Sequence, residues 1–230
     1  MSSLVAMHGW CGDQRSWEAW LPHWQARGWK VSCGERGYGQ QSPQQPSWPQ
    51  AGGPKVVIAH SLGPHLLARE LLEQADAVVL LTSFGRFVPP GREGRPLQIA
   101  LQAMAHELAG NQPETMLQTF LQRVAAPQPV ELLQTTPASS ALGAGGLVQL
   151  QNDLALLSRS NGLPEGFPPG ARVLLVQAGQ DQIVVPAARQ ALEQALPHAD
   201  VLTLAQAGHA LLRTPVIGLV NAWIDGLSSA

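Results

Sequence analysis

Cysteine and charged residues are both scarce in this chain. Only two cysteines, Cys11 and Cys33, occur among 230 residues, which is too few for a disulfide framework. Proteins that stay inside the cell normally keep such thiols reduced, so we expect two free cysteines. Charged residues make up 13% of the chain and the formal net charge is −2. This composition excludes the strongly basic surface that is typical of nucleic-acid-binding proteins.

Long apolar runs are also missing. No stretch approaches the roughly 20 apolar residues of a membrane-spanning helix, and no charged start leads into an apolar segment that resembles a secretion signal. We therefore expect a cytoplasmic protein that binds neither membrane nor nucleic acid. Apolar residues still make up 45% of the chain. That is enough for one sizeable core, so we expect a globular monomer with one domain and room for an insertion.

Short apolar segments alternate with helical patterns along much of the chain. Strands are expected at 4–7, 29–33, 55–59, 77–83, 171–179 and 199–208. Apolar residues at helical spacing predict helices at 13–28, 61–74, 186–198 and 214–229. Strands that are apolar throughout are buried on both faces, which is typical of a mostly parallel sheet flanked by helices. The fold class is therefore α/β.

Residues 85–170 break this alternation. They contain helical patterns such as "LQIALQAMAHELAG" and "ETMLQTFLQRV" but no convincing strand, and they lie between two sheet strands. We interpret them as an inserted helical cap, with 1–84 and 171–230 forming the core. Ligands of open α/β sheets bind beyond the carboxyl ends of the strands, which is where we expect the cap to lie.

Ser61 stands where an apolar strand meets a helix, in "VVIAHSLGPH". Strand, sharp turn and helix together are the context of a nucleophile elbow, whose tight turn needs small residues two places before and after the nucleophile. Here these residues are Ala59, where glycine is usual, and Gly63. The elbow would hold the Ser61 hydroxyl above the sheet and point the backbone N–H of Leu62 at the same space. The alternative is an ordinary turn with Ser61 as a helix N-cap.

A serine needs a base, and the base needs a carboxylate that orients it. Asp181 follows the fifth strand and His209 follows the sixth, in the chain order Ser, acid, His that this elbow requires. Taken singly, Asp181 could be a solvated loop acid and His209 a surface histidine. Taken with Ser61, the two predict a catalytic triad that needs no metal and no cofactor. Asp153 is the alternative carboxylate.

An oxyanion hole needs a second N–H beside that of Leu62. The first strand ends in "MHGWCGD", and the tight turn after Gly9 can direct the backbone N–H of Trp10 at the reacting carbonyl. The Trp10 ring could equally be a core aromatic or a wall of the pocket. His60 and His65 flank the serine, and we interpret them as structural or pocket-lining residues.

These motifs resemble the α/β-hydrolase superfamily. The resemblance rests on "HGW", "GERGYGQQS", "AHSLG", "GQDQIV" and "AGHA", and it extends from Leu4 to Trp223. Within the superfamily the chain resembles the pimeloyl-[acyl-carrier protein] methyl ester esterases of biotin synthesis. The HGW turn before a Trp-containing helix, the SLG elbow, "TFLQRV" and "GGLVQLQNDLALL" carry this closer resemblance.

The resemblance implies a role for each matching residue. Ser61 would be the nucleophile, Asp181 the acid and His209 the base, while Trp10 and Leu62 would supply the oxyanion donors and contact the substrate. Acyl-channel contacts are implied for one run of the cap: Phe120, Leu121, Gln122, Arg123 and Val124. An acyl-carrier protein that carries the substrate is the implied partner. The family's basic cap residues are not reproduced, because "QPETMLQT" occupies that stretch, and Arg123 and Arg159 are the nearby candidates.

The sequence therefore predicts a serine esterase, with the methyl ester of pimeloyl-[acyl-carrier protein] as the expected substrate. Two kinds of alternative stay open. Another carboxylesterase or thioesterase, or a lyase of menaquinone synthesis, could use the same residues on the same fold. A hydrolase fold retained as a binding module could also carry this sequence, although such a module would not need a base behind its serine.

Overall fold

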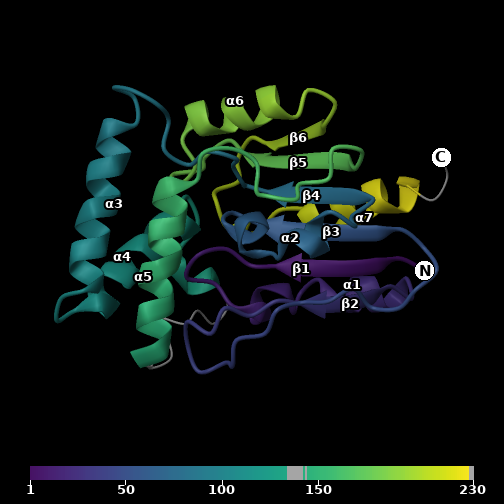
Figure 1. Ribbon diagram of the computed structural model, residues 1–230, viewed down its shortest axis with the longest axis horizontal. Coiled ribbons are helices and arrows are strands. Elements are labelled where there is room, and N and C mark those ends of the chain that lie inside the picture. The colour runs from purple at the N-terminus through teal and green to yellow at the C-terminus, as the bar shows by residue number, and fades with distance from the viewer. Residues whose placement is uncertain (134–141, 143, 228–230) are drawn as a thin grey trace.

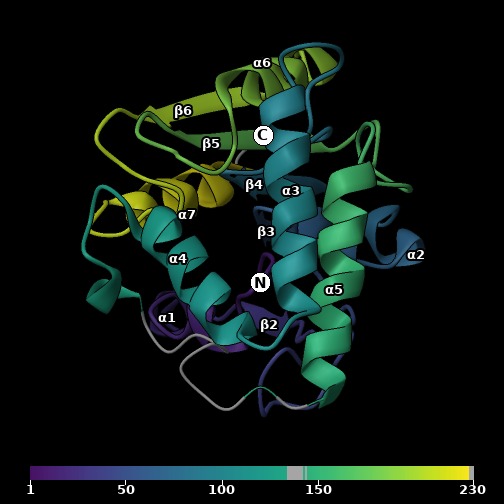
Figure 2. The same ribbon diagram turned by 90° about the vertical axis from the view of Figure 1, so that its left-hand side faces the viewer.

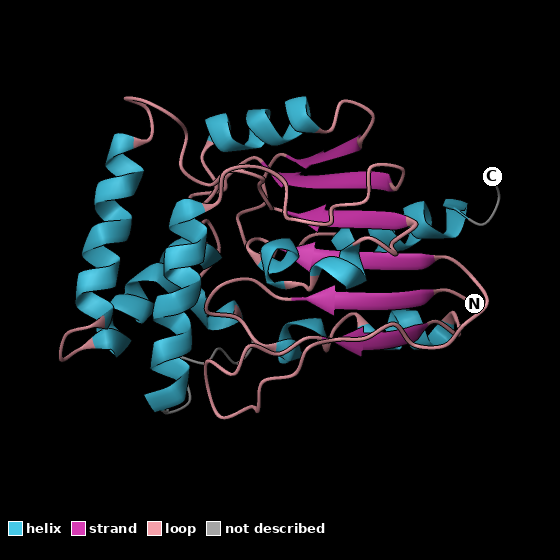
Figure 3. Ribbon diagram, viewed as in Figure 1, coloured by secondary structure: helices cyan, strands magenta, loops and turns pink. Residues whose placement is uncertain are grey.

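Six strands form one parallel sheet in the order β2-β1-β3-β4-β5-β6 (Figures 1 and 3). The structure is a computed structural model that describes residues 1–133, 142 and 144–227. The strands are β1 (Ser3–Met7), β2 (Lys30–Cys33), β3 (Lys55–His60), β4 (Ala77–Leu81), β5 (Arg172–Ala178) and β6 (Asp200–Leu204). The parallel α/β sheet predicted from the sequence is confirmed.

The central strands carry continuous apolar runs because each is covered on both faces. In β1, Val5 and Met7 pack into one apolar cluster, and Leu4 and Ala6 pack into the other. All five residues of β1 and of β4 are buried. The edge strand β6 is more open, and its Val201 is 48% exposed. Continuous apolar runs thus mark the centre of the sheet.

Helices cover both faces of the sheet (Figure 2). On one face lie η1 (Gln14–Trp17), α1 (Leu21–Ala26) and α7 (Val216–Leu227), and on the other lie α2 (Arg69–Leu72) and α6 (Pro186–Ala195). Trp17, Trp20 and Trp24 pack together on the α1 side. These aromatic rings fill the space between the sheet, α1 and α7.

The helix expected at 61–74 is interrupted. A short 3₁₀ helix, η2 (Gly63–Leu66), is followed by extended backbone at Leu67 and Ala68, and only then by the single turn of α2. Leu66, Leu67 and both leucines of α2 are all buried. A continuous helix would turn neighbouring leucines about 100° apart, whereas the extended break lets all four face the core.

A helical cap lies beyond the carboxyl ends of the strands (Figures 1 and 2). It comprises α3 (Arg95–Leu108), α4 (Pro113–Ala125), η3 (Val130–Leu132) and α5 (Ala144–Arg159), all between β4 and β5. The inserted helical cap of the predicted fold is confirmed, while its exact limits at 85 and 170 stay a prediction. No helix in the described part of the chain is both long and apolar enough to span a membrane.

Candidate active site

Ser61 occupies a strained turn directly after β3. Its φ angle is +55°, a left-handed conformation that a residue other than glycine adopts at a cost. The Ser61 N–H donates to the carbonyl oxygen of Leu81 on the neighbouring strand, at 2.9 Å. A Cβ atom at Gly63 would lie 2.5 Å from the carbonyl oxygen of Met7, so only glycine fits there. Ala59, fully buried in β3, occupies the other position where the elbow needs a small residue.

The turn after β1 lies against the Ser61 side chain. A Cβ atom at Gly9 would lie 2.8 Å from Cβ of Ser61, so glycine permits this close approach. The turn is closed by the Gly12 N–H, which donates to the Gly9 carbonyl at 3.1 Å. Within the described part of the chain, no acceptor faces the backbone N–H of Trp10 or of Leu62. The predicted oxyanion donors are thus not engaged by the backbone of the described residues.

Asp181 and His209 are hydrogen-bonded, with 3.0 Å between Asp181 Oδ2 and His209 Nδ1. The other carboxylate oxygen, Oδ1, accepts the N–H groups of Ile183 at 2.7 Å and Val184 at 3.0 Å. Burial alone would raise the pKa of the Asp181 carboxyl, but the His209 ring and these two N–H groups outweigh burial and lower it. Asp181 is thus held as a carboxylate that fixes the orientation of the imidazole.

Two side chains that the sequence analysis did not select hold this region together. Thr82 Oγ1 donates to the carbonyl oxygen of His209 at 2.9 Å, and Ser83 Oγ donates to that of Ser61 at 2.6 Å. His60 Nε2 adds a second contact to the His209 carbonyl, at 3.0 Å. The sequence carried a signal for these two side chains, namely the polar pair "TS" at the end of an apolar strand. Polar residues at the carboxyl edge of such a sheet tend to face the ligand site.

The described residues contain no hydrogen bond between the Ser61 hydroxyl and the His209 ring. Such contacts are often long without a substrate and shorten when one binds. Asp153 lies elsewhere, paired with Arg36 rather than with His209. Among the predicted residues, the structure therefore joins Asp181 to His209 and sets Gly9 against Ser61. The triad and the oxyanion donors stay predictions.

Ser61 lines a cavity of about 250 Å³ below the cap. Most of its wall is apolar and comes from α3, α4, α5 and the loops beside them: Trp10, Phe87, Leu97, Leu101, Met104, Met116, Phe120, Leu154, Leu157 and Ile183. Glu107, Thr119, Arg123 and Gln182 also line it, and all four are exposed to solvent. The cavity is therefore apolar inside and polar where it meets solvent.

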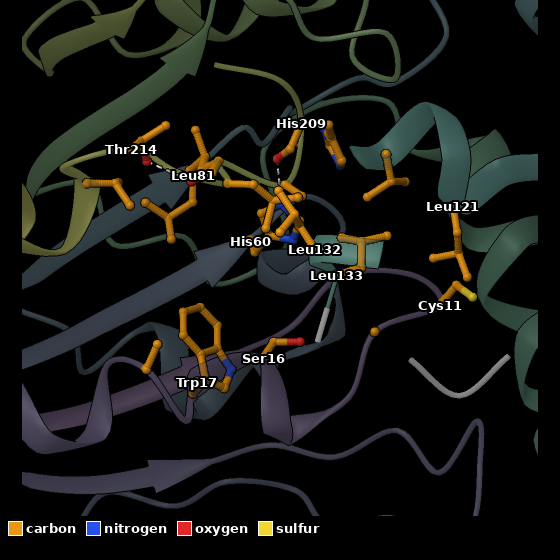
Figure 4. A pocket seen from close by; sticks show the side chains of 18 of the residues that line it. Cys11, Ser16, Trp17, His60, Leu81, Leu121, Leu132, Leu133, His209 and Thr214 are labelled. Atoms are coloured by element: carbon orange, nitrogen blue, oxygen red, sulfur yellow. Dashed lines mark hydrogen bonds between the residues drawn. The ribbon is translucent and has the colours of Figure 1, made fainter. Parts of the chain in front are cut away.

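A second cavity, of about 310 Å³, lies on the His209 side (Figure 4). Ser16 and Trp17 line one wall of it, opposite His60 and His209. Trp10 and Phe120 line both cavities, and their rings meet edge to face with centroids 4.8 Å apart. This ring pair is a common wall between the two spaces.

The run 120–124 divides between the two cavities. Phe120 and Arg123 line the Ser61 cavity, whereas Phe120, Leu121 and Val124 line the second one. Gln122 is exposed and lines neither. Different sides of α4 therefore face the two cavities. The sequence pattern did not reveal this distinction.

Nothing in the described residues gathers three His, Cys, Asp or Glu side chains as metal ligands would be gathered. Both cysteines are free thiols. Burial raises the pKa of Cys11 to about 12 and that of Cys33 to about 11, so neither is an ionised nucleophile near neutral pH. Burial also lowers the pKa of His60 to about 3, with His209 nearby adding to the shift, so His60 is neutral.

No protein-family model matches this chain, and no curated protein is significantly similar to it in sequence. Solved structures do resemble it. The esterase EaEST from Exiguobacterium antarcticum is 16% identical with a TM-score of 0.68, and the match covers 98% of this chain and 90% of that one. A thermophilic esterase from Thermogutta terrifontis is 15% identical with a TM-score of 0.68, over 98% of this chain and 90% of that one. The esterase RhEst1 from Rhodococcus sp. ECU1013 is 17% identical with a TM-score of 0.62, over 96% of this chain and 90% of that one. These likenesses show that this chain has the α/β-hydrolase fold.

Proposed function

We propose that this chain is a serine esterase that hydrolyses a carboxylic ester. The observation that carries the proposal is the hydrogen bond between buried Asp181 and His209, beside a serine held at positive φ on the floor of an apolar cavity. A binding module would need the cavity, but it would not need a carboxylate aimed at an imidazole. The esterases among proteins of similar fold agree with this chemistry.

In this mechanism the Ser61 hydroxyl attacks the ester carbonyl while His209 Nε2 accepts its proton. Asp181 keeps the proton of the imidazole on Nδ1 and stabilises the imidazolium cation that forms. The backbone N–H groups of Trp10 and Leu62 bind the oxyanion, and each contributes about 3 kcal/mol to the transition state. The alcohol leaves with the proton from His209. A water molecule then repeats the sequence on the acyl-enzyme and releases the acid.

Labelling and kinetics with Ser61→Ala test this proposal. The unmodified protein should hydrolyse p-nitrophenyl acetate and bind a fluorophosphonate probe covalently, with the adduct mapping to Ser61 by mass spectrometry. Ser61→Ala should lose both properties while its melting temperature stays close to that of the unmodified protein. Unchanged hydrolysis by the variant would exclude Ser61 as the nucleophile. An unmodified protein that neither reacts with the probe nor hydrolyses esters would favour the binding module.

The substrate that we propose is the methyl ester of pimeloyl-[acyl-carrier protein]. The motif resemblance supports it, and so does the Ser61 cavity. At about 250 Å³ the cavity is smaller than the roughly 300–1,000 Å³ of most ligand sites, which suits a medium acyl chain better than a large lipid. Its apolar inner wall would hold the methylene groups of such a chain. The carrier end would then emerge where the cavity meets solvent.

Arg123 is our candidate for carrier recognition. It is exposed and lines the Ser61 cavity, so an acidic carrier docked at the opening would meet its charge. Glu107, exposed on the same cavity, offsets part of that charge. Arg159, also exposed, lines neither of the two cavities, which makes it the weaker candidate.

Growth rescue distinguishes this substrate from other esters. A biotin-requiring strain that lacks its methyl esterase should grow without biotin when it expresses this protein, and should fail to grow with Ser61→Ala. Expression without rescue, combined with activity on small esters in vitro, would favour a general carboxylesterase. Faster turnover of acyl thioesters than of oxygen esters would favour a thioesterase. Elimination without hydrolysis would favour the lyase.

A further inference from the structure

Helix α5 of the cap is joined to the core by a buried polar cluster. Asp153 on α5 is 2% exposed, and both of its carboxylate oxygens accept hydrogen bonds. Oδ2 accepts from Arg36 Nε at 2.8 Å and from the Tyr38 hydroxyl at 2.6 Å, while Oδ1 accepts from Arg36 Nη2 at 2.6 Å and from Gln149 Nε2 at 3.0 Å. We refer to Arg36, Tyr38, Gln149 and Asp153 as the Asp153 cluster.

One face of α5 meets the core, and its Leu150 and Asp153 make polar contacts there. Gly146, Gln149, Leu150 and Asp153 are spaced by three or four residues, so they lie along one side of the helix. A Cβ atom at Gly146 would lie 2.0 Å from the carbonyl oxygen of Tyr38, so the helix backbone touches the loop that carries Arg36. The Leu150 carbonyl accepts the indole N–H of Trp10 at 2.9 Å.

The next turns of the same helix form part of the Ser61 cavity. Leu154 and Leu157 are 2% and 4% exposed and line that cavity. They directly follow Asp153 on a rigid helix, so any rotation or shift of α5 would move both side chains. The position of this wall is therefore tied to the geometry of the Asp153 cluster.

Apolar packing alone would fix the position of α5 less precisely than the Asp153 cluster does. Leucine contacts tolerate small shifts of one element along another, whereas a planar guanidinium that binds a carboxylate through two parallel hydrogen bonds tolerates few. Burying the Asp153 carboxylate beside the half-buried Arg36 also carries a desolvation cost, so an ion pair of this kind is a weak device for stability alone. A role in fixing the position of α5 accounts for that cost.

We propose that the Asp153 cluster positions α5 and thereby sets the length of the acyl chain that the Ser61 cavity admits. This proposal rests on the esterase function proposed above, and it makes Arg36, Tyr38 and Asp153 positioning residues rather than catalytic ones. The Trp10 indole meets α5 at the Leu150 carbonyl, but the backbone of residues 9–12 is closed by its own hydrogen bond and lies against Ser61. A change at Asp153 should therefore affect the acyl wall more than the oxyanion donors.

Asp153→Asn tests the proposal through two substrates of different length. With an octanoyl ester, loosening α5 should raise KM about tenfold, equivalent to losing contact with about two methylene groups. With an acetyl ester, which does not reach Leu154 or Leu157, kcat and KM should each change less than about threefold. Tyr38→Phe removes one hydrogen bond without leaving a charge unpaired, so it should shift the same ratio by a smaller factor.

The matched control is Asp225→Asn. It breaks an arginine–aspartate pair with Arg27 that has an N–O distance of 3.1 Å but lies exposed on α7, away from the cap. Neither substrate should respond to it. A parallel loss on both substrates in Asp153→Asn, or no change on either, would overturn the proposal. If Asp153→Asn does not fold, the ratio measured with Tyr38→Phe decides in its place.

Amide hydrogen exchange gives a readout that does not depend on activity. Residues 146–157 should exchange faster in Tyr38→Phe and Asp153→Asn than in the unmodified protein, while the strands of the sheet keep their protection. Unchanged exchange in α5 would overturn the positioning role. If the unmodified protein hydrolyses neither ester, the esterase proposal fails on its own, and hydrogen exchange still decides whether the cluster holds the helix.

Discussion

Asp181→Asn tests the role of Asp181 as the acid of the triad, because the structure determines how an amide side chain would be oriented at this position. The Oδ1 atom of Asp181 accepts two backbone N–H groups, from Ile183 at 2.7 Å and Val184 at 3.0 Å. An amide must keep its oxygen there, since an NH₂ group would face two donors. Its NH₂ group then faces Nδ1 of His209, which has to accept rather than donate. The ring proton moves to Nε2, where the base must be free to accept the proton of Ser61.

The expected loss is about 10⁴-fold in kcat, because the imidazole is held in the wrong tautomer while the rest of the site is intact. That factor corresponds to about 5 kcal/mol of transition-state stabilisation. Steady-state hydrolysis of p-nitrophenyl acetate measures kcat and KM, and KM should change little because the cavity wall is unaltered. Circular dichroism and the melting temperature serve to exclude unfolding as the cause.

Asp153→Asn is the matched control for this experiment, because it removes a buried carboxylate of the same kind that contacts Arg36 instead of His209. It should leave turnover of the acetyl ester within about threefold, because the hydrogen-bond partners of Asp153 in the described residues are Arg36, Tyr38 and Gln149 and not Ser61, Asp181 or His209. If Asp181→Asn keeps more than about a tenth of the native kcat, tautomer control by Asp181 is refuted and another carboxylate must orient the base.

Three further predictions follow from the same geometry. Phe120→Ala should lower kcat/KM about tenfold for an octanoyl ester and much less for an acetyl ester, because the ring borders the acyl cavity. Equal losses of kcat/KM on both esters would make Phe120 part of the cap core. Since the pKa of His60 falls from 6.5 to about 3 on folding, the unfolded chain binds the extra proton between these values. His60 alone should therefore lower stability by about 2 kcal/mol between pH 8 and pH 5. Burial also lowers the pKa of His8 and His65, so they add to the slope. Denaturant titrations should show a shallower slope in His60→Gln, and an identical slope in the variant would contradict a buried neutral His60. If an acidic carrier docks by charge, Arg123→Glu and added salt should each slow hydrolysis of the carrier-linked ester and leave that of a small soluble ester unchanged. Arg159→Glu is the comparison variant. Equal responses of both substrates would exclude docking by charge.

Much of the fold and part of the candidate site could be predicted from the sequence because they depend on local patterns. Strands buried on both faces have to be apolar throughout, which revealed the sheet. The elbow around Ser61 requires small neighbours, and the structure shows why at Gly63, where the carbonyl of Met7 leaves no room for a Cβ atom. The positions of Asp181 and His209 at strand ends followed from the same alternation, since carboxyl ends of parallel strands share one edge.

The sequence alone thus determined the fold class, the elbow and the residue types at the carboxyl edge of the sheet. Only the tertiary structure decided which partners those residues contact. Asp153 meets Arg36 across 117 positions of the chain, and Thr82 meets the carbonyl of His209 across 127. Local spacing carries no information about contacts of this range. They arise when the cap folds over the sheet and the loops after the strands meet at its carboxyl edge, where each buried polar group takes the partner within hydrogen-bond distance.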